Sequence, residues 1–170
     1  YGYEAKSDHA VTFVLPQGVS RIEILDKAQE LVTDRNLIFP DALERWRNDP
    51  KFTTKAAQTE RFYIDGHVPK SVDKTRQEQE QYVKDEGKRL SLNVELPNVE
   101  DLAVAFVMHY VATGRSFFGD AWAVRAAGGA LCFVSHGLNV GVIDGDNFYS
   151  SVFAVSARAL PELKMEADSN

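Results

Sequence analysis

Hydrophobic and polar positions are unevenly distributed along this 170-residue chain. Residues 70–89 contain 11 charged side chains, whereas the 60 residues from 102 to 161 contain only six. A stretch so poor in charge must be mostly buried, against itself or against a partner. The pattern therefore predicts that the hydrophobic core lies in the C-terminal half.

The strongest single pattern predicts a helix over Val99–Thr113. Asn98 is its expected N-cap, acidic residues occupy the first turn where the helix dipole favours them, and Gly114 ends it. The body of this segment is apolar on nearly all sides. Such a helix is expected to be central and covered by other elements.

The N-terminal part begins with an expected strand over Ala10–Leu15, ended by a Pro-Gln-Gly turn signal. The following residues allow two interpretations. Ser20 and Glu23 fit a capping box that starts a helix, or residues 19–25 form the second strand of a hairpin. Both interpretations make residues 27–34 helical, with Ala28, Leu31 and Val32 facing inward.

Four further elements are expected before the central helix. A short helix over residues 42–48 is preceded by Pro40-Asp41 and stopped by Asp49-Pro50. Residues 59–64 have the β-branched and aromatic composition of a strand. Residues 72–85 form a polar helix ended by Gly87, and residues 90–96 alternate as another strand. Because the polar helix has so few apolar positions, we expect residues 70–89 to form an exposed flap or a partner-facing arm.

The C-terminal part predicts short strands separated by Gly-, Asp- and Asn-rich turns. Their ranges are 121–126, 130–135, 139–143 and 151–157. The prediction is a single α+β domain over residues 1–170, in which the apolar helix packs on a mainly antiparallel sheet with a C-terminal β-meander. Residues 162–170 are expected to form a frayed tail.

Composition excludes several classes of function. A net charge of −6 and a pI near 5.2 argue against binding of nucleic acid or an anionic membrane. The single cysteine excludes an internal disulfide framework, and no apolar run is long enough to span a bilayer. No secretory signal opens the chain. These features favour a cytoplasmic or virion-associated protein.

No common catalytic or nucleotide-binding motif occurs, so no catalytic residue, metal or cofactor is predicted. An enzyme whose site assembles in space is the alternative. It would be a small hydrolase or transferase using Cys132 or Ser135 with a histidine (His109 or His67) and an aspartate (Asp120 or Asp144). Cys132 lies in an apolar run, however, and His109 shares a helical face with Leu102 and Phe106, which favours a hydrogen-bonded core histidine.

One loop has the oxygen-rich composition of a calcium site, namely Asp144-Gly145-Asp146-Asn147. It lacks the spacing and the distal bidentate glutamate of an EF-hand. Aspartate and asparagine are also common turn formers, because they tolerate positive φ and bond their own backbone. The turn is therefore the favoured interpretation.

Aromatic and amide side chains are gathered on the predicted C-terminal hairpins, as in many recognition surfaces. The alternative is that Trp122 and Phe148 simply close the core. The candidate ligand-binding residues are Trp122, Arg125, Asn139, Asp146, Asn147 and Tyr149.

About a third of the chain resembles bacterial and phage C-type-lectin-like ligand-binding domains. The matching pieces are residues 96–102, Trp122-Ala123-Val124-Arg125, Gly128-Gly129 and Ser156-Ala157-Arg158-Ala159-Leu160. The resemblance implies that the strand at Ala10–Leu15 pairs with the last strand. It also implies a non-enzymatic binding or adaptor domain that recognises a protein or a glycan through the hairpin loops.

Overall fold

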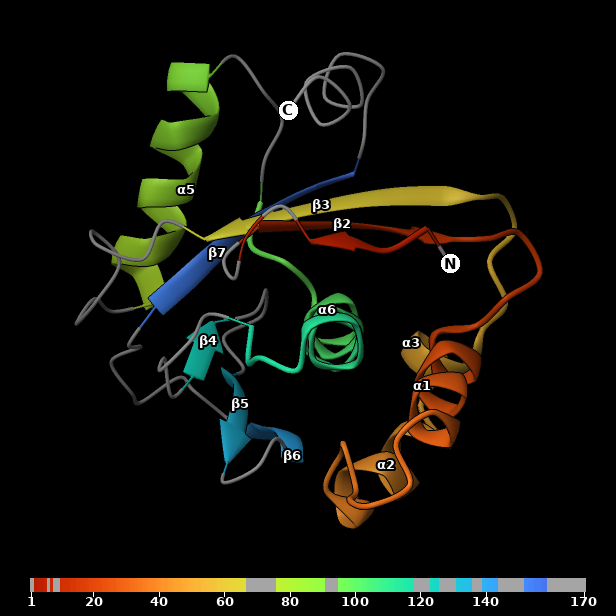
Figure 1. The fold of residues 1–170 in the computed structure, drawn as a ribbon. Coiled ribbons are helices and arrows are strands. Elements are labelled where there is room, and N and C mark those ends of the chain that lie inside the picture. Colours follow the sequence, from red (N-terminus) through yellow and green to blue (C-terminus); the bar gives the residue numbers. More distant parts are fainter. Residues whose placement is uncertain are drawn as a thin grey trace.

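A computed structural model describes residues 2–5, 7, 10–66, 76–90, 95–117, 123–125, 131–135, 139–143 and 152–158. Helices and strands together give an α+β arrangement, as predicted (Figure 1). The strands are β1 (Glu4–Ala5), β2 (Ala10–Leu15), β3 (Glu60–Gly66), β4 (Ala123–Arg125), β5 (Leu131–Ser135), β6 (Asn139–Ile143) and β7 (Val152–Arg158). The helices are α1 (Arg21–Glu30), α2 (Pro40–Trp46), α3 (Pro50–Thr53), α5 (Arg76–Leu90) and α6 (Val99–Thr113).

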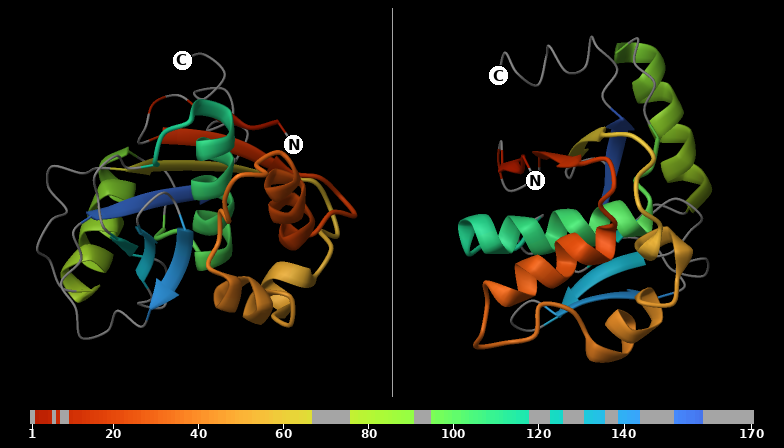
Figure 2. Two further views of the ribbon diagram at one scale, coloured as in Figure 1. Left: turned by 60° about the horizontal axis from the view of Figure 1, so that its bottom comes forward. Right: turned by 90° about the vertical axis from the view of Figure 1, so that its right-hand side faces the viewer.

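The described strands pair in the order β1-β2-β3-β7-β4-β5-β6. Most neighbours are antiparallel, and Phe13 on β2 stands opposite Phe62 on β3 with ring centroids 4.8 Å apart. The sheet curls around α6, so that β2 and β3 lie on one side of this helix and β5 and β6 on another (Figures 1 and 2). The apolar helix thus occupies the centre of the arrangement.

Strand β7 differs from the sequence expectation. Strands β4, β5 and β6 pair antiparallel in chain order, but β7 pairs parallel with β4 and antiparallel with β3. The prediction that all four strands form an antiparallel meander is therefore wrong for β7. The implied pairing of Ala10–Leu15 with the last strand is also wrong, because β3 lies between β2 and β7. In this position β7 hydrogen-bonds two strand edges that would otherwise be unpaired.

Helix α6 has the predicted bounds. Gly114 takes φ 73°, the left-handed conformation of a helix C-cap, and its N–H donates to the Tyr110 carbonyl. Asn98 occupies the N-cap position without a side-chain hydrogen bond. Every residue from Asp101 to Val107 is buried, which confirms that the helix is covered on all sides at its N-terminal end.

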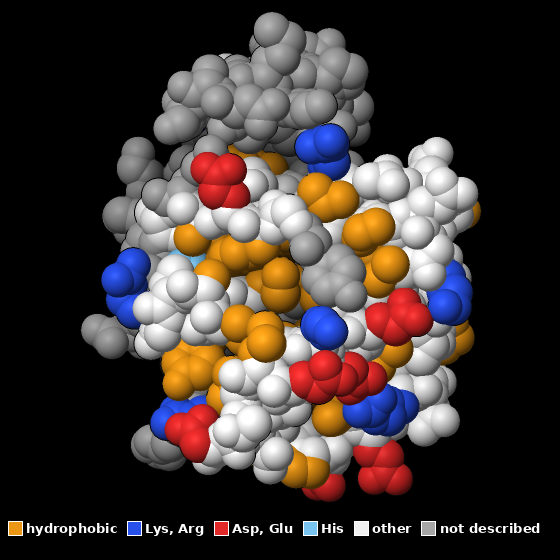
Figure 3. Space-filling model, turned by 45° about the vertical axis from the view of Figure 1, so that its right-hand side comes forward, with side chains coloured by type: hydrophobic (Ala, Val, Ile, Leu, Met, Phe, Trp, Pro, Cys, Tyr) orange, Lys and Arg blue, Asp and Glu red, His pale blue; other side chains and the backbone are white. Residues whose placement is uncertain are grey.

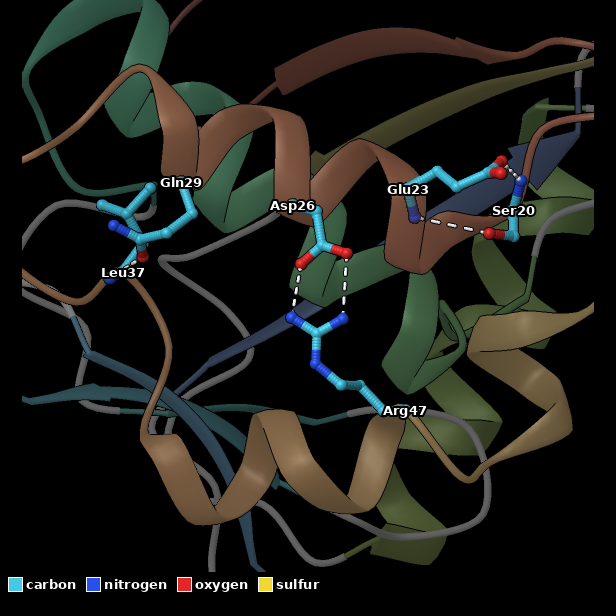
Figure 4. Close-up of polar contacts among 6 residues, drawn as sticks. All are labelled: Ser20, Glu23, Asp26, Gln29, Leu37 and Arg47. Carbon is cyan, nitrogen blue, oxygen red and sulfur yellow. Dashed lines mark hydrogen bonds and ion pairs between the residues drawn. The ribbon is translucent and has the colours of Figure 1, made fainter.

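Helix α1 resolves the ambiguity left by the sequence. The Ser20 hydroxyl accepts from the Glu23 N–H, and the Glu23 carboxylate accepts from the Ser20 N–H at 2.7 Å (Figure 4). This reciprocal capping box starts the helix, and the hairpin alternative is wrong. The helix ends at Glu30, earlier than predicted. Leu31 at its C-cap is 68% exposed, so the prediction of an inward Leu31 is wrong.

Polar side chains hold the loop after α1 in place. Gln29 donates to the carbonyls of Val32 and Arg35 and accepts from the Leu37 N–H at 2.9 Å (Figure 4). Beside it, the Arg47 guanidinium after α2 binds both carboxylate oxygens of Asp26. These contacts fix α1 against the segment that leads to α2.

Two helix ends also differ from prediction. Asp49 follows α2 and also starts the next helix: its side chain accepts a hydrogen bond from the Lys51 N–H and caps α3. Helix α5 continues through Gly87 to Leu90, so Gly87 does not end it. Gln79 and Val83 of α5 are buried and Val83 packs with Leu96, so one face of this polar helix is covered.

The described core is shared between both halves of the chain. Buried side chains of β2, α1, α2, α3 and β3 form one cluster with those of α6 and Phe117. In the described part, then, the core is not confined to the C-terminal half. The charge pattern gave no sign of this because the N-terminal elements alternate buried apolar positions with charged ones.

Candidate functional site

A groove opens between the C-terminal halves of α1 and α6. Its volume is about 510 Å³. Figure 3 turns the α1 side of the molecule forward and shows hydrophobic side chains gathered around a hollow in the middle of this face. The residues that line this α1–α6 groove are Gly2, Tyr3, Ile24, Lys27, Ala28, Leu31, Met108, Val111 and Ala112.

The lining follows from the helical repeat. On α1, Ile24, Ala28 and Leu31 lie on one stripe at spacings of four and three residues. On α6, Met108, Val111 and Ala112 do the same. The two helices run in the same direction (Figure 2). Arg21 contacts Asp101 near the start of both helices, and the groove lies toward their ends.

The N-terminal segment forms the third wall. The Tyr3 hydroxyl hydrogen-bonds Nδ1 of His109 at 2.8 Å, and His109 is fully buried. Gly2 takes φ 63°, and a Cβ there would lie 2.9 Å from Val14 Cγ2. Both the backbone conformation and the close approach to β2 therefore favour glycine at this position. The sequence expectation that His109 is a hydrogen-bonded core histidine is confirmed.

Of the lining residues that the structure describes, Lys27 is the charged one. Its Nζ lies 3.8 Å from the Glu30 carboxylate, and the two side chains are 64% and 70% exposed. An ion pair this long and this exposed is weak. The ammonium group is consequently free to meet a polar group at the groove rim.

Other charged contacts near α1 stabilise the fold and lie away from the groove. The hydrogen bond from the Ser20 backbone N–H is the main cause that lowers the pKa of Glu23, and the hydrogen bond from Lys55 lowers this pKa further. The Asp26 carboxylate raises the pKa of Arg47 through its hydrogen bonds. The Arg21 Nε donates to Asp101 at 2.8 Å, with the guanidinium over the Phe62 ring. All three arrangements tie helices to neighbouring segments.

Most of the sequence-predicted site lies outside the described residues. Trp122, Asp146, Asn147 and Tyr149 all fall there. The other two residues of that set, Arg125 and Asn139, lie on described strands.

Arg125 ends β4 and Asn139 begins β6. Arg125 stands opposite Leu131 and Asn139 opposite Ser135, so they flank the two ends of β5. At about 3.4 Å per residue this separates them by about 13 Å along the strand direction. A single ligand that touches both would have to extend along β5.

The alternative catalytic residues are placed only in part. Cys132 pairs in register with Val142, and Ser135 with Asn139, while His109 is buried against Tyr3. His67, Asp120 and Asp144 lie outside the described residues, as does the loop at 144–147. Of these candidate groups, only the His109 side chain is described.

Two kinds of site are absent from the part of the chain that the structure covers. Its histidine, cysteine, aspartate and glutamate side chains form no group of three that could hold a metal ion. None of its helices combines the length and the apolar character that a membrane crossing requires.

Comparison with protein-family models, with curated proteins and with solved structures finds no match for this chain. The function must therefore be argued from the geometry of the molecule. The resemblance to C-type-lectin-like domains stays a prediction.

Sequence reasoning missed the α1–α6 groove. Its third wall comes from Gly2 and Tyr3, which carry no periodic pattern. The available signal was the apolar stripe of α6, which continues through the half-buried Val111 to the exposed Ala112. Together with Leu31, this stripe leaves more apolar surface at the helix ends than the core uses.

Proposed function

We propose that the protein is a non-enzymatic binding domain whose ligand site is the α1–α6 groove. The observation that carries this proposal is an apolar hollow of about 510 Å³ between two helices and an extended segment. Ligand pockets have volumes of about 300–1,000 Å³, apolar linings and few polar groups. The groove matches each of these properties.

Recognition in this groove would depend on burial of apolar surface. The Tyr3 hydroxyl is already engaged by His109. Ile24, Ala28, Met108 and Val111 offer only hydrocarbon and a thioether. An apolar ligand gains about 25 cal/mol for each Å² of apolar surface removed from water. Leu31, which is exposed at the groove, would be covered by the same event.

A catalytic role has weaker support. A general acid or base needs access to substrate, and His109 has no exposed surface. Glu23, Asp26 and Arg21 are engaged in a helix cap and in ion pairs away from the groove. An acid–base site would have to form elsewhere in the chain.

Recognition of a protein or a glycan by the C-terminal hairpin loops is the second candidate. The antiparallel pairing of β4, β5 and β6 favours it, because such pairing gathers strand ends along two edges. The net charge of −6 argues against nucleic acid as the partner. The expected contact residues are Trp122, Arg125, Asn139, Asp146, Asn147 and Tyr149.

The groove proposal is tested with the neutral fluorescent probe N-phenyl-1-naphthylamine, whose emission rises in apolar surroundings. The variant Ala112→Trp places a large ring on an exposed groove residue. It should weaken probe binding at least about tenfold, because the ring fills the space that the probe occupies. Ala57→Trp makes the same exchange on an exposed residue outside the lining and should bind the probe normally.

Two results would contradict the groove proposal. One is the absence of saturable probe binding by the unaltered protein. The other is equal weakening by Ala112→Trp and Ala57→Trp. Circular dichroism of both variants checks that the helices are intact. Loss of binding in variants of Trp122 or Asn147 alone would favour the hairpin loops instead.

A further inference from the structure

The described lining of the groove is uncharged except for Lys27, and this positive charge limits the class of ligand that the groove favours. We propose, building on the function proposed above, that the groove binds a free single-chain amphiphile with a carboxylate head group. The tail would lie along Ile24, Ala28, Met108 and Val111, and the head would meet Lys27 at the rim. The binding is non-covalent and needs no cofactor.

Volume sets the size of the tail. A space of about 510 Å³ equals that of about 17 water molecules at about 30 Å³ each. A chain of about 12 carbons with its carboxylate head group has about 14 non-hydrogen atoms. Each of these atoms, with its hydrogens, has a volume close to that of a water molecule. Such a chain fits the groove with little space left over. Much longer chains would extend into solvent beyond Leu31.

Lys27 sets the sign of the head group. Among the described residues that line the groove it alone is charged, and its stem of four methylenes can cover apolar surface while the ammonium group stays in water. Its contact with Glu30 is 3.8 Å long and exposed. A carboxylate at the rim would compete for the ammonium group without breaking a strong ion pair.

The helix ends act in the opposite direction. Both α1 and α6 end beside the groove, where partial negative charge disfavours an anion. Several of these terminal carbonyls already accept hydrogen bonds, from Leu31 N–H, Gly114 N–H and the Thr113 hydroxyl. The dipole effect also falls off within the last turn, whereas Lys27 carries a full positive charge. Lys27 therefore outweighs the helix ends, and the groove favours a negatively charged head group.

A helix from a protein partner fits less well. A third helix packed on α1 and α6 would need a channel about 10 Å wide. The N-terminal segment occupies that position, because Tyr3 is bonded to His109 and β1 is paired with β2. The space that remains between this segment and the two helices fits a single extended hydrocarbon chain.

The test compares two ligands of equal length on two proteins. Dodecanoate and dodecanol compete with N-phenyl-1-naphthylamine at low ionic strength, below their aggregation concentrations. They are applied to the unaltered protein and to Lys27→Met, which keeps an apolar side chain of similar length. Lys51→Met is the matched control, because Lys51 is exposed on α3 and does not line the groove.

We expect dodecanoate to bind the unaltered protein about threefold to fivefold more tightly than dodecanol, the upper part of the range of an exposed ion pair. In Lys27→Met the two ligands should bind alike, while Lys51→Met should keep the preference. Raising the salt concentration should reduce the preference.

Three outcomes would overturn the ligand class. Equal binding of acid and alcohol by the unaltered protein is one, and a preference that persists in Lys27→Met is another. Displacement of the probe by an acidic amphipathic peptide but by neither dodecyl ligand would assign the groove to a protein partner. In each case the probe still binds, so the groove remains a ligand site. Failure of the proposed function is different, since the probe itself would not bind.

Discussion

The two ends of the α1–α6 helix pair are built differently. At the N-terminal end, the Arg21–Asp101 ion pair is buried, with side chains only 12% and 3% exposed. The Phe62 ring covers the guanidinium, and the Lys51 carbonyl accepts from it. At the C-terminal end, Leu31 and Ala112 are exposed and the helices leave a groove.

The two ends of this helix pair therefore have different roles, one in the stability of the fold and the other in ligand binding. The N-terminal end has an ion pair in closed surroundings, and its guanidinium contacts a carboxylate, a carbonyl and a ring. The C-terminal end keeps apolar side chains next to water, which contributes little to folding. Exposed apolar surface gathered in a concave place is typical of an interaction site. We therefore assign folding to the closed end and recognition to the open end.

The largest expected effect comes from breaking the closed end with Asp101→Ala. The buried Arg21 guanidinium would lose its ion-pair partner, and the free energy of unfolding should fall by about 3 kcal/mol. Urea denaturation measures the change. Arg47→Ala is the control, because its pair with Asp26 is 48% and 41% exposed and should cost no more than about 1 kcal/mol. Equal losses of unfolding free energy in the two variants would mean that the Arg21–Asp101 pair contributes no more to stability than an exposed ion pair.

A smaller effect is expected at the open end from Tyr3→Phe. The variant keeps the ring that forms the groove wall and removes the hydroxyl bonded to His109. Stability should fall by about 1 kcal/mol. Probe binding should change by less than about twofold, because the apolar lining is retained.

The control for this prediction is Tyr110→Phe. Tyr110 lies on α6 with its ring 5.7 Å from the Arg35 guanidinium, a contact that phenylalanine preserves. Its loss of stability should be smaller than that of Tyr3→Phe. A larger loss for Tyr110→Phe would show that the Tyr3–His109 contact does not hold the N-terminal segment.

The smallest effect concerns the cap that starts α1. Because the Ser20 N–H and Lys55 lower the pKa of Glu23 below its ordinary value of 4.5, the ionised form is favoured in the folded state. Its contribution to stability is complete above pH 4.5 and is lost as the pH falls through the lower folded pKa. The melting temperatures of the unaltered protein and of Glu23→Gln should therefore converge as the pH falls below 4.5. A difference that stays constant with pH would contradict this prediction.

The sequence predicts those elements whose signals are local. Helix α6 has its predicted bounds because an apolar body, acidic first turn and terminal glycine agree. The Ser20–Glu23 box starts α1, although the sequence allowed a strand there. Gly87 shows the limit of local signals, since α5 continues beyond it to Leu90 and packs Val83 against Leu96.

Features that depend on distant segments were not predictable. The position of β7 between β3 and β4 depends on which edges remain open after the other strands have paired. The groove depends on Tyr3 meeting His109 across 106 positions of the chain. No spacing within either segment encodes that contact. The hairpin residues predicted as a site lie mostly outside the described structure and stay a prediction.

The most direct test of the division between the two helix ends is methyl NMR during a titration with dodecanoate. We expect the methyl signals of Ile24, Leu31, Met108 and Val111 to shift together and saturate. Those of Leu102 and Val104, in the N-terminal half of α6, should stay unchanged. Shifts confined to methyl groups of β5 and β6, or no saturable shift at the open end, would contradict it.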